Sequence, residues 1–181
     1  MGHDLAFKGI TARIAGVATE SVVDGPGFRS TVFFQGCSHQ CPGCHNPGTW
    51  DPVGGLEITL PKLIDLLKLN PMISGVTFSG GEPFWQAPAA AALAGYLKPK
   101  GLNIWVYTGY TWEELLSSVD APGYKDLLHY ADVVVDGPFL REKRDPTLIF
   151  RGSSNQRFIL VSESYQMGTI ITWEPQRIQI R

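Results

Sequence analysis

The 181-residue sequence has few cysteines, no long apolar run and almost no net charge. No apolar stretch approaches the roughly 20 residues that a membrane-spanning helix needs. The first eight residues lack the basic start and apolar core of a secretory signal. A formal net charge of −2 provides no overall attraction to nucleic acid or to an anionic membrane. These absences favour one cytoplasmic domain over residues 1–181 that binds neither nucleic acid nor membrane.

The three cysteines of the chain, Cys37, Cys41 and Cys44, lie within eight residues. An odd number of clustered thiols without a secretory signal argues against a disulfide framework. The C-x3-C-x2-C spacing brings three thiols to one loop, where a single inorganic centre can take all of them. A centre with three protein ligands keeps one coordination position open for chemistry. The spacing therefore predicts a metal or iron–sulfur centre.

Zinc is the rival interpretation of the same cysteines. A structural zinc site would take His39 or His45 as its fourth ligand. Such sites usually gather ligands from two separated pairs, and this chain has no second pair of cysteines. The His-x-Glu element of the zinc deaminases is also missing. Zinc remains the weaker alternative.

Glycine and proline divide the chain into segments that alternate between strand and helix patterns. Helices are expected from Pro61, from Pro88 to about Leu97, and from Thr111, where Thr-Trp-Glu-Glu matches a capping box. The tail, residues 169–181, fits an edge strand or a contact surface. This alternation predicts an α/β fold with a mainly parallel sheet, whose ligands bind beyond the strands' carboxyl ends. Strand patterns cover residues 10–14, 28–35, 75–78, 103–107, 132–136 and 157–161.

Several chemically capable residues follow these strands. In Ser79-Gly-Gly-Glu-Pro83, the glycines allow close backbone approach to a ligand, and Glu82 can accept a hydrogen bond from an ammonium. Taken alone, the segment is a plain turn. Asp136 ends an apolar strand, so it is either exposed at the strand mouth or needs a partner. We expect it at the mouth, facing a cofactor or a cation.

The cysteine spacing resembles the cluster motif of the radical S-adenosylmethionine (radical SAM) superfamily. Val23-Asp-Gly-Pro-Gly27, with residues 33–37, 44–46 and 49–50, is similar to the glycyl-radical-enzyme activases. Residues 36–44, 105–110, 135–137 and 151–156 are similar to the subgroup that activates anaerobic (class III) ribonucleotide reductase. The resemblance spans about residues 14–156. A full G-x-I-x-G-x-x-E ribose pattern is not evident.

The resemblance implies an incomplete, TIM-like βα barrel of about five to six βα units; a complete barrel needs about 250 residues. It implies a [4Fe–4S] cluster on Cys37, Cys41 and Cys44, with SAM on the open iron. Asn46 is alternatively a local turn residue. The SAM contacts implied are Gly43, His45, Asn46, Gly80, Gly81, Glu82, Pro83, Thr108, Gly109 and Asp136.

The implied activity is the reductive cleavage of SAM to a 5′-deoxyadenosyl radical, which takes hydrogen from a glycine of the reductase catalytic subunit. An external one-electron donor such as flavodoxin or ferredoxin would supply the electron. Residues 24–27 would line the opening for the partner, and residues 151–156 would contact it; a plain turn and a solvated loop are the alternatives. Other candidates are the activase of another glycyl radical enzyme, a small-molecule radical SAM enzyme, or a non-enzymatic zinc or iron–sulfur module.

Overall fold

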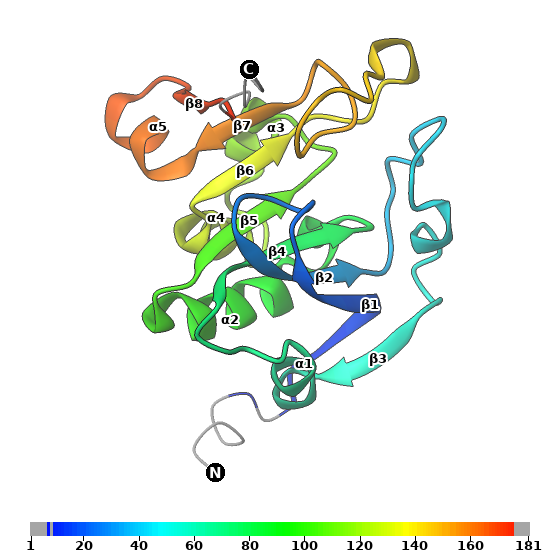
Figure 1. Ribbon diagram of the computed structural model, residues 1–181, viewed down its shortest axis with the longest axis vertical. Helices are drawn as coiled ribbons and strands as arrows, with labels where there is room; N and C mark the ends of the chain where they lie inside the picture. The colour runs from blue at the N-terminus through cyan, green and yellow to red at the C-terminus, as the bar shows by residue number, and fades with distance from the viewer. Residues whose placement is uncertain (1–6, 8, 176–181) are drawn as a thin grey trace, which may run out of the picture.

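The computed structural model describes residue 7 and residues 9–175, which build an eight-stranded sheet in the order β3-β1-β2-β4-β5-β6-β7-β8 (Figure 1). Five of the strands coincide closely with the predicted segments. Phe28–Phe34 and Asn103–Tyr107, for example, are strands over almost the residues expected. The strands are β1 (Thr11–Ser21), β2 (Phe28–Phe34), β3 (Leu56–Thr59), β4 (Ile73–Gly80), β5 (Asn103–Tyr107), β6 (Val133–Asp136), β7 (Arg157–Leu160) and β8 (Thr172–Trp173).

The fold is mixed α/β, as expected, but the sheet is not mainly parallel. Parallel pairing joins β2, β4, β5 and β6. The other four pairings are antiparallel: β1 with β2 and β3, β6 with β7, and β7 with β8. Three helical crossovers connect the parallel strands, fewer than the five to six βα units expected. The single short turn between β1 and β2 explains their antiparallel pairing, because a short connection can join only antiparallel neighbours.

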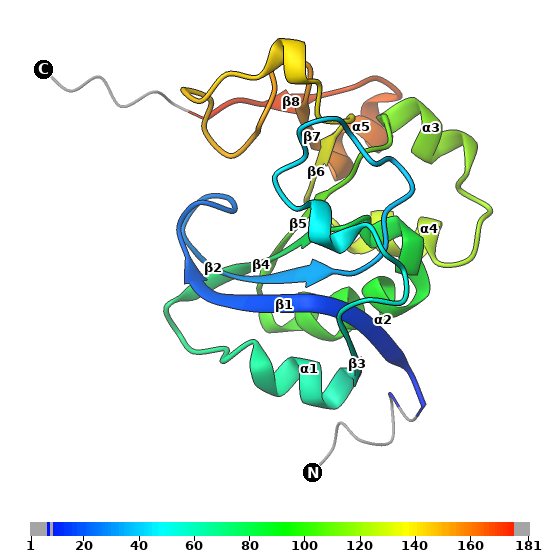
Figure 2. The ribbon, with the colours of Figure 1, turned by 90° about the vertical axis from the view of Figure 1, so that its right-hand side faces the viewer.

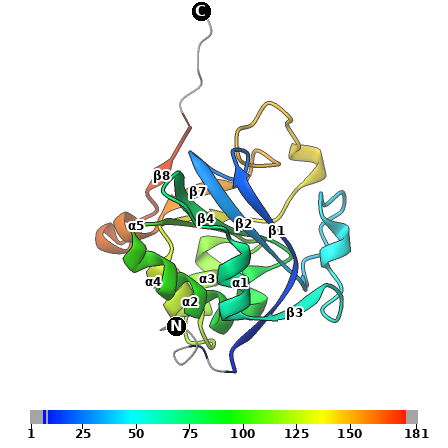
Figure 3. The same cartoon turned by 60° about the horizontal axis from the view of Figure 1, so that its bottom comes forward.

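Helices α1, α2 and α4 gather on one side of the sheet, away from the loops at residues 37–50 and 138–156 (Figure 3). The predicted capping box of Thr111 is present at the start of α3. None of the described helices is long and apolar enough to cross a membrane. The helices are α1 (Leu60–Leu66), α2 (Ala87–Leu97), α3 (Trp112–Ser117), α4 (Tyr124–Tyr130) and α5 (Val161–Met167), with short 3-10 turns η1 (Pro47–Thr49), η2 (Pro83–Gln86), η3 (Lys98–Lys100) and η4 (Arg141–Lys143).

Alternate strand residues point toward these helices and form the main core. Phe34 and Phe78 are fully buried there, with ring centroids 5.5 Å apart, and each contributes about 2–3 kcal/mol by burial. Residues of the opposite parity, such as Thr31, Thr77 and Tyr107, lie on the other face of the sheet. This second face is more polar, and it leads to the cysteine loop.

Some local expectations needed correction. The residue pattern after Pro61 predicts that Leu63, Leu66 and Leu67 share one buried face, but Leu66 is 41% exposed whereas the other two are fully buried. Trp85 and Trp112 are both predicted from the sequence to be packing residues; Trp112 is buried, whereas Trp85 is half-exposed and lies over Gly36. In the tail, Thr172–Trp173 forms the edge strand β8, whereas residues 176–181 lie outside the described part of the chain.

Candidate iron–sulfur and cofactor site

The cysteine loop leaves the end of β2 and is closed at its base by backbone hydrogen bonds. The amide of Gly36 donates to the carbonyl of Thr49 at 2.8 Å, and that of Cys37 donates to the carbonyl of Trp50 at 3.1 Å. The buried Gln35 side chain donates to two further loop carbonyls, at 3.0 and 2.7 Å. These hydrogen bonds between protein groups fix the two ends of the loop to each other. Figure 2 shows the path of the loop, in light blue to cyan, above β1 and β2.

Backbone amides surround the three half-buried sulfur atoms. The Asn46 amide donates to Cys44 Sγ at 3.3 Å. Burial raises the pKa of the Cys37 and Cys41 thiols, and nearby backbone N–H groups, including that of Phe139 at Cys41, oppose this rise. Iron and zinc bind the thiolate form, which such amides stabilise. This donor set of three thiols and directed amides fits a [4Fe–4S] cluster.

The two candidate zinc-binding imidazoles are occupied elsewhere. His39 Nε2 lies 3.1 Å from Oε2 of Glu82, and the His45 ring packs on Phe139 with centroids 5.2 Å apart. The geometry therefore does not favour the zinc alternative.

The turn after β4 is bound tightly to the base of the cysteine loop. The Gly81 amide donates to the carbonyl of Phe34, and the Glu82 amide to that of Gly36, both at 2.8 Å. A Cβ on Gly81 would lie 2.4 Å from the Gly36 carbonyl oxygen, and one on Gly80 would lie 2.6 Å from Phe33 Cα. Both glycines are thus required by close approach of two protein segments.

The Glu82 carboxylate is fully buried and is satisfied by the protein itself. It accepts hydrogen bonds from the amides of Phe84 and Gly109, each at 2.9 Å, and from the Thr108 hydroxyl at 3.0 Å. The first of these bonds caps the turn that begins at Pro83. All the hydrogen bonds that the carboxylate accepts in this structure come from protein groups, and its contact with an ammonium stays a prediction.

His39 fills the space between the cysteine loop and the end of β5. A Cβ on Gly109 would lie 2.4 Å from the His39 ring, which also meets Tyr110 edge-on at a centroid distance of 4.5 Å. The distance from Nε2 to Glu82 is that of an ion pair, but Nε2 has no hydrogen-bond partner among the described residues. His39 therefore covers Glu82, Thr108 and Gly109.

The prediction that Asp136 is exposed at a strand mouth is wrong. Its side chain is 1% exposed and does not lie at an open strand mouth. The carboxylate accepts a hydrogen bond from the Trp112 amide at 2.8 Å and is paired with the Arg157 guanidinium, whose Nε lies 3.0 Å away. The alternative, a carboxylate with a partner, is what the structure contains, and a cofactor contact of Asp136 stays a prediction.

A cavity of about 560 Å³ opens beside the cysteine loop on the polar face of the sheet, within the usual range of ligand sites. Cys44, His45 and Asn46 line it, together with Ser79 at the end of β4 and Tyr107 at the end of β5. Gly43, Gly80, Gly81, Pro83 and Gly109 do not. Of the predicted cofactor residues, the cavity therefore brings together His45 and Asn46 with one cysteine.

Two loops for which the sequence predicted only partner contacts, with a plain turn and a solvated loop as alternatives, also line this cavity. Val22, Val23 and Asp24 approach from the β1–β2 turn, and residues 148–152 with Gln156 approach from the other side. The Tyr107 hydroxyl donates to the Phe150 carbonyl at 2.6 Å and holds the second wall. The Phe139 ring contacts Gly152 and the cysteine loop. Nothing in the local sequence around Phe139 signals this role.

The β1–β2 turn is braced by a buried cation. Arg29 is 1% exposed and donates to Thr77 Oγ1 at 2.7 Å, while the Thr77 hydroxyl donates to the Asp24 carbonyl at 2.8 Å. Burial lowers the pKa of Arg29 to about 10, which leaves it charged at neutral pH. The Asp24-Gly-Pro-Gly27 segment is therefore a turn in a fixed position against the sheet.

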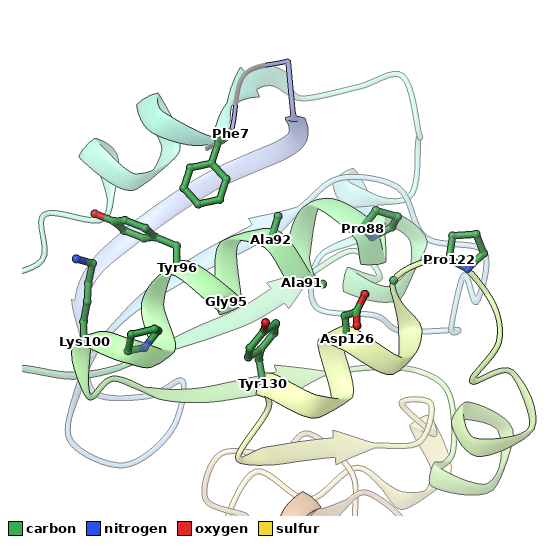
Figure 4. Close-up of a pocket in the computed structure, with 12 residues that line it drawn as sticks. Phe7, Pro88, Ala91, Ala92, Gly95, Tyr96, Lys100, Pro122, Asp126 and Tyr130 are labelled. Carbon is green, nitrogen blue, oxygen red and sulfur yellow. The ribbon is translucent and has the colours of Figure 1, made fainter. Parts of the chain in front are cut away.

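A larger hollow of about 890 Å³ lies between α2 and α4 (Figure 4). Tyr96, Tyr130, prolines and alanines line it, and Lys100 and Asp126 are its charged residues. It contains no thiol and belongs to the helical face, away from the cysteine loop. The smaller cavity is the candidate site because it contains Cys44 and the ends of the parallel strands.

Comparisons with known proteins agree with an iron–sulfur site. Residues 23–159 match the family model described as "4Fe-4S single cluster domain". An anaerobic ribonucleoside-triphosphate reductase-activating protein from Vibrio cholerae is 43% identical over 143 residues, or 75% of this chain and 89% of the relative. Its namesake from Escherichia coli K12 is 36% identical, over 75% and 90%. A pyruvate formate-lyase-activating enzyme from Clostridium pasteurianum is 39% identical, over 61% and 50%.

The cysteine loop and the matched domain define a 4Fe–4S protein of the mixed α/β class. The chain belongs to the family of anaerobic ribonucleoside-triphosphate reductase-activating proteins. This membership confirms the resemblance to glycyl-radical-enzyme activases and, with it, the [4Fe–4S] cluster and SAM as cofactors.

Proposed function

We propose that this chain activates an anaerobic ribonucleotide reductase by installing a glycyl radical on its catalytic subunit. The observation that carries the proposal is the three-cysteine loop, which adjoins a cavity of about 560 Å³ at the strand ends through Cys44. When bound, the cluster and SAM supply the one-electron chemistry that removes a hydrogen atom from a glycine Cα. Two relatives named as reductase-activating proteins, each matched over about nine-tenths of its length, support this assignment.

The residues of the chain would hold and orient these groups. Cys37, Cys41 and Cys44 would ligate three irons, and the amides directed at their sulfurs would favour the thiolate form. Asn46 and His45, which line the cavity, would contact SAM. The backbone at Gly43 and at Gly80–Gly81 remains a further proposed contact. Glu82, Pro83, Thr108 and Gly109 would act behind His39, as the support of the loop.

The glycine-bearing segment of the partner would enter between the two walls of the cavity. Val22 and Val23 on one wall are 57% and 72% exposed, and Ile149 on the other is 37% exposed. Between the described edge strands β3 and β8 the sheet stays open. We interpret it as a partial barrel, since a closed barrel would leave no lateral entry for a polypeptide.

A second candidate is the activation of another glycyl radical enzyme. The 39% identity to a pyruvate formate-lyase-activating enzyme over 120 residues favours it. That relative is matched over only half of its length, whereas the reductase-activating proteins are matched over about nine-tenths. The reductase is therefore the preferred partner.

Anaerobic reconstitution with iron and sulfide, followed by dithionite and SAM, tests both candidates. We expect a broad absorption near 400 nm, formation of 5′-deoxyadenosine, and a glycyl doublet in electron paramagnetic resonance on the ribonucleotide reductase. The Cys41→Ala variant should lose all three signals, whereas Ser38→Ala in the same loop should keep them. A doublet only on pyruvate formate-lyase would select the second candidate, and a doublet with Cys41→Ala would contradict both.

A further inference from the structure

A basic surface lies directly against the cysteine loop. It consists of Arg141, Lys143 and Arg144, in and just after η4, and is called the basic rim below. A Cβ on Gly43 would lie 3.6 Å from Arg141 Cδ and 3.4 Å from the Phe139 ring. The backbone N–H of Phe139 also lies near the Cys41 sulfur. Gly43, which precedes the ligand Cys44, and Phe139, whose amide lies near Cys41, therefore connect the basic rim to the cluster ligands. The turn η4 is the yellow turn at the top of Figure 2.

The charges of the basic rim are available to a partner. All three side chains are exposed, and none takes part in an ion pair within the described residues. One acid, Glu142, lies among them. Asp145 accepts hydrogen bonds from the amide and the hydroxyl of Thr147, at 2.8 and 2.7 Å. Residues 37–50 contain no acid, although the chain has a net charge of −2.

The basic rim does not coincide with the cavity. Cys41, Gly43 and Arg141 are not among the residues that line it, whereas Cys44 is. The loop tip at Pro42 and Gly43 is exposed. A protein seated on the basic rim would approach the cluster at Cys41 and leave the cavity beside Cys44 open for SAM and the glycine segment.

We propose that the basic rim docks an acidic, one-electron carrier protein. The inference rests on the proposed function, in which the cluster must receive one electron from outside the chain. The carrier is oxidised by one electron and the cluster is reduced by one, and no bond or proton moves. Electron transfer weakens steeply with distance, so the carrier must sit at the surface nearest the sulfurs. Opposite charges raise the rate of such encounters and orient them.

Binding without turnover is the first test, with flavodoxin, a small acidic carrier, as the probe. The variant R141Q/K143Q/R144Q removes the charges and keeps side chains that can pack on Gly43. Using the full chain without its cluster, we expect the Kd for flavodoxin to rise about tenfold at low salt. The control K62Q/K68Q/K125Q changes the net charge equally on the helical side and should stay within about twofold. Equal effects of the two variants, or no effect of the first, would overturn the proposal.

Reduction is the second test, made with the reconstituted full chain. Reduced flavodoxin should form 5′-deoxyadenosine about tenfold more slowly with the basic-rim variant, and added salt should narrow the difference. Dithionite needs no docking surface, so cleavage and glycyl radical formation driven by dithionite should be unchanged. A loss of glycyl radical with dithionite would assign the basic rim to the reductase and overturn the proposal. Failure of dithionite-driven cleavage in the wild type would overturn the proposed function instead, while the binding test would still decide on the basic rim.

Discussion

His39 Nε2 lies 3.1 Å from Oε2 of Glu82, and this contact joins the cysteine loop to the turn after β4. Glu82 is in turn hydrogen-bonded to Thr108 and Gly109 at the end of β5. One buried carboxylate therefore ties three separate segments together. Its immediate partners are protein groups, so its first role is to hold the loop in place.

Replacement of Glu82 by Gln should destabilise the protein. The amide NH₂ would face the N–H groups of Phe84 and Gly109, and at least one buried donor would lose its acceptor. The expected cost in the free energy of unfolding is about 2 kcal/mol, measured by urea denaturation of the cluster-free chain. Glu163→Gln, at an exposed position in α5, should change it by less than about 0.5 kcal/mol. Equal stability of the two variants would contradict the role given to Glu82.

Replacement of Gly109 by Ala should displace His39. The new Cβ would lie 2.4 Å from the imidazole ring, and overpacking of this kind costs about 1–3 kcal/mol. In a chain that already carries His39→Ala, the same change should cost almost nothing, because the clashing ring is gone. A double-mutant cycle by thermal or urea unfolding measures this coupling. Additive effects would show that the two residues are not in contact.

Replacement of Tyr107 by Phe should loosen one wall of the cavity. The change removes the 2.6 Å hydrogen bond to the Phe150 carbonyl and should cost about 1 kcal/mol. Because burial raises the pKa of Tyr107, its hydroxyl remains protonated and donates throughout the neutral range. We expect faster amide hydrogen exchange at residues 148–152 and a KM for SAM raised several-fold with little change in kcat. Tyr165→Phe, on α5, serves as the control and should alter neither.

The ion pair between Glu113 and Arg157 should contribute a pH-dependent stability. Hydrogen bonding to Arg157 lowers the pKa of Glu113 below its usual 4.5. A lowered pKa means that the contribution is present above the unfolded value and is lost as the pH falls through the folded value. At pH 7 the wild type should be more stable than Glu113→Gln by about 0.5 kcal/mol, since the pair is exposed. Unfolding at pH 7 and below pH 4 measures whether this difference disappears, and Glu113→Gln compared with the wild type at both pH values is the deciding pair.

The sequence was sufficient to locate the chemistry because its signals are local. Three cysteines in one loop need no tertiary information, and β-rich runs such as 103–107 form strands through their own side-chain pattern. The capping box of Thr111 is likewise contained within four residues. Local signals predict that β2, β4 and β5 are strands. They do not show whether the strands at the two sides of the sheet pair parallel or antiparallel.

Interactions between distant residues were beyond this reasoning. The partner of Asp136 is Arg157, twenty-one residues away, and only the pairing of β6 with β7 brings them together. Glu82 meets Gly109 across twenty-seven residues in the same way. A carboxylate at a strand end therefore looks available in the sequence when the fold has already provided its partner. One signal was missed: the Asp-Gly-Pro-Gly turn between two strand patterns favours a hairpin, and hence antiparallel pairing.

The closed base of the cysteine loop makes the stability of the fold independent of whether the cluster is bound. The bonds from Gly36, Cys37 and Gln35 are made between protein groups, without iron. A zinc finger, by contrast, loses its fold with its metal. We expect the chain to remain folded after oxygen has destroyed its cluster, and to accept a new cluster without refolding. Exposure to air would then remove the cofactor but leave the polypeptide intact.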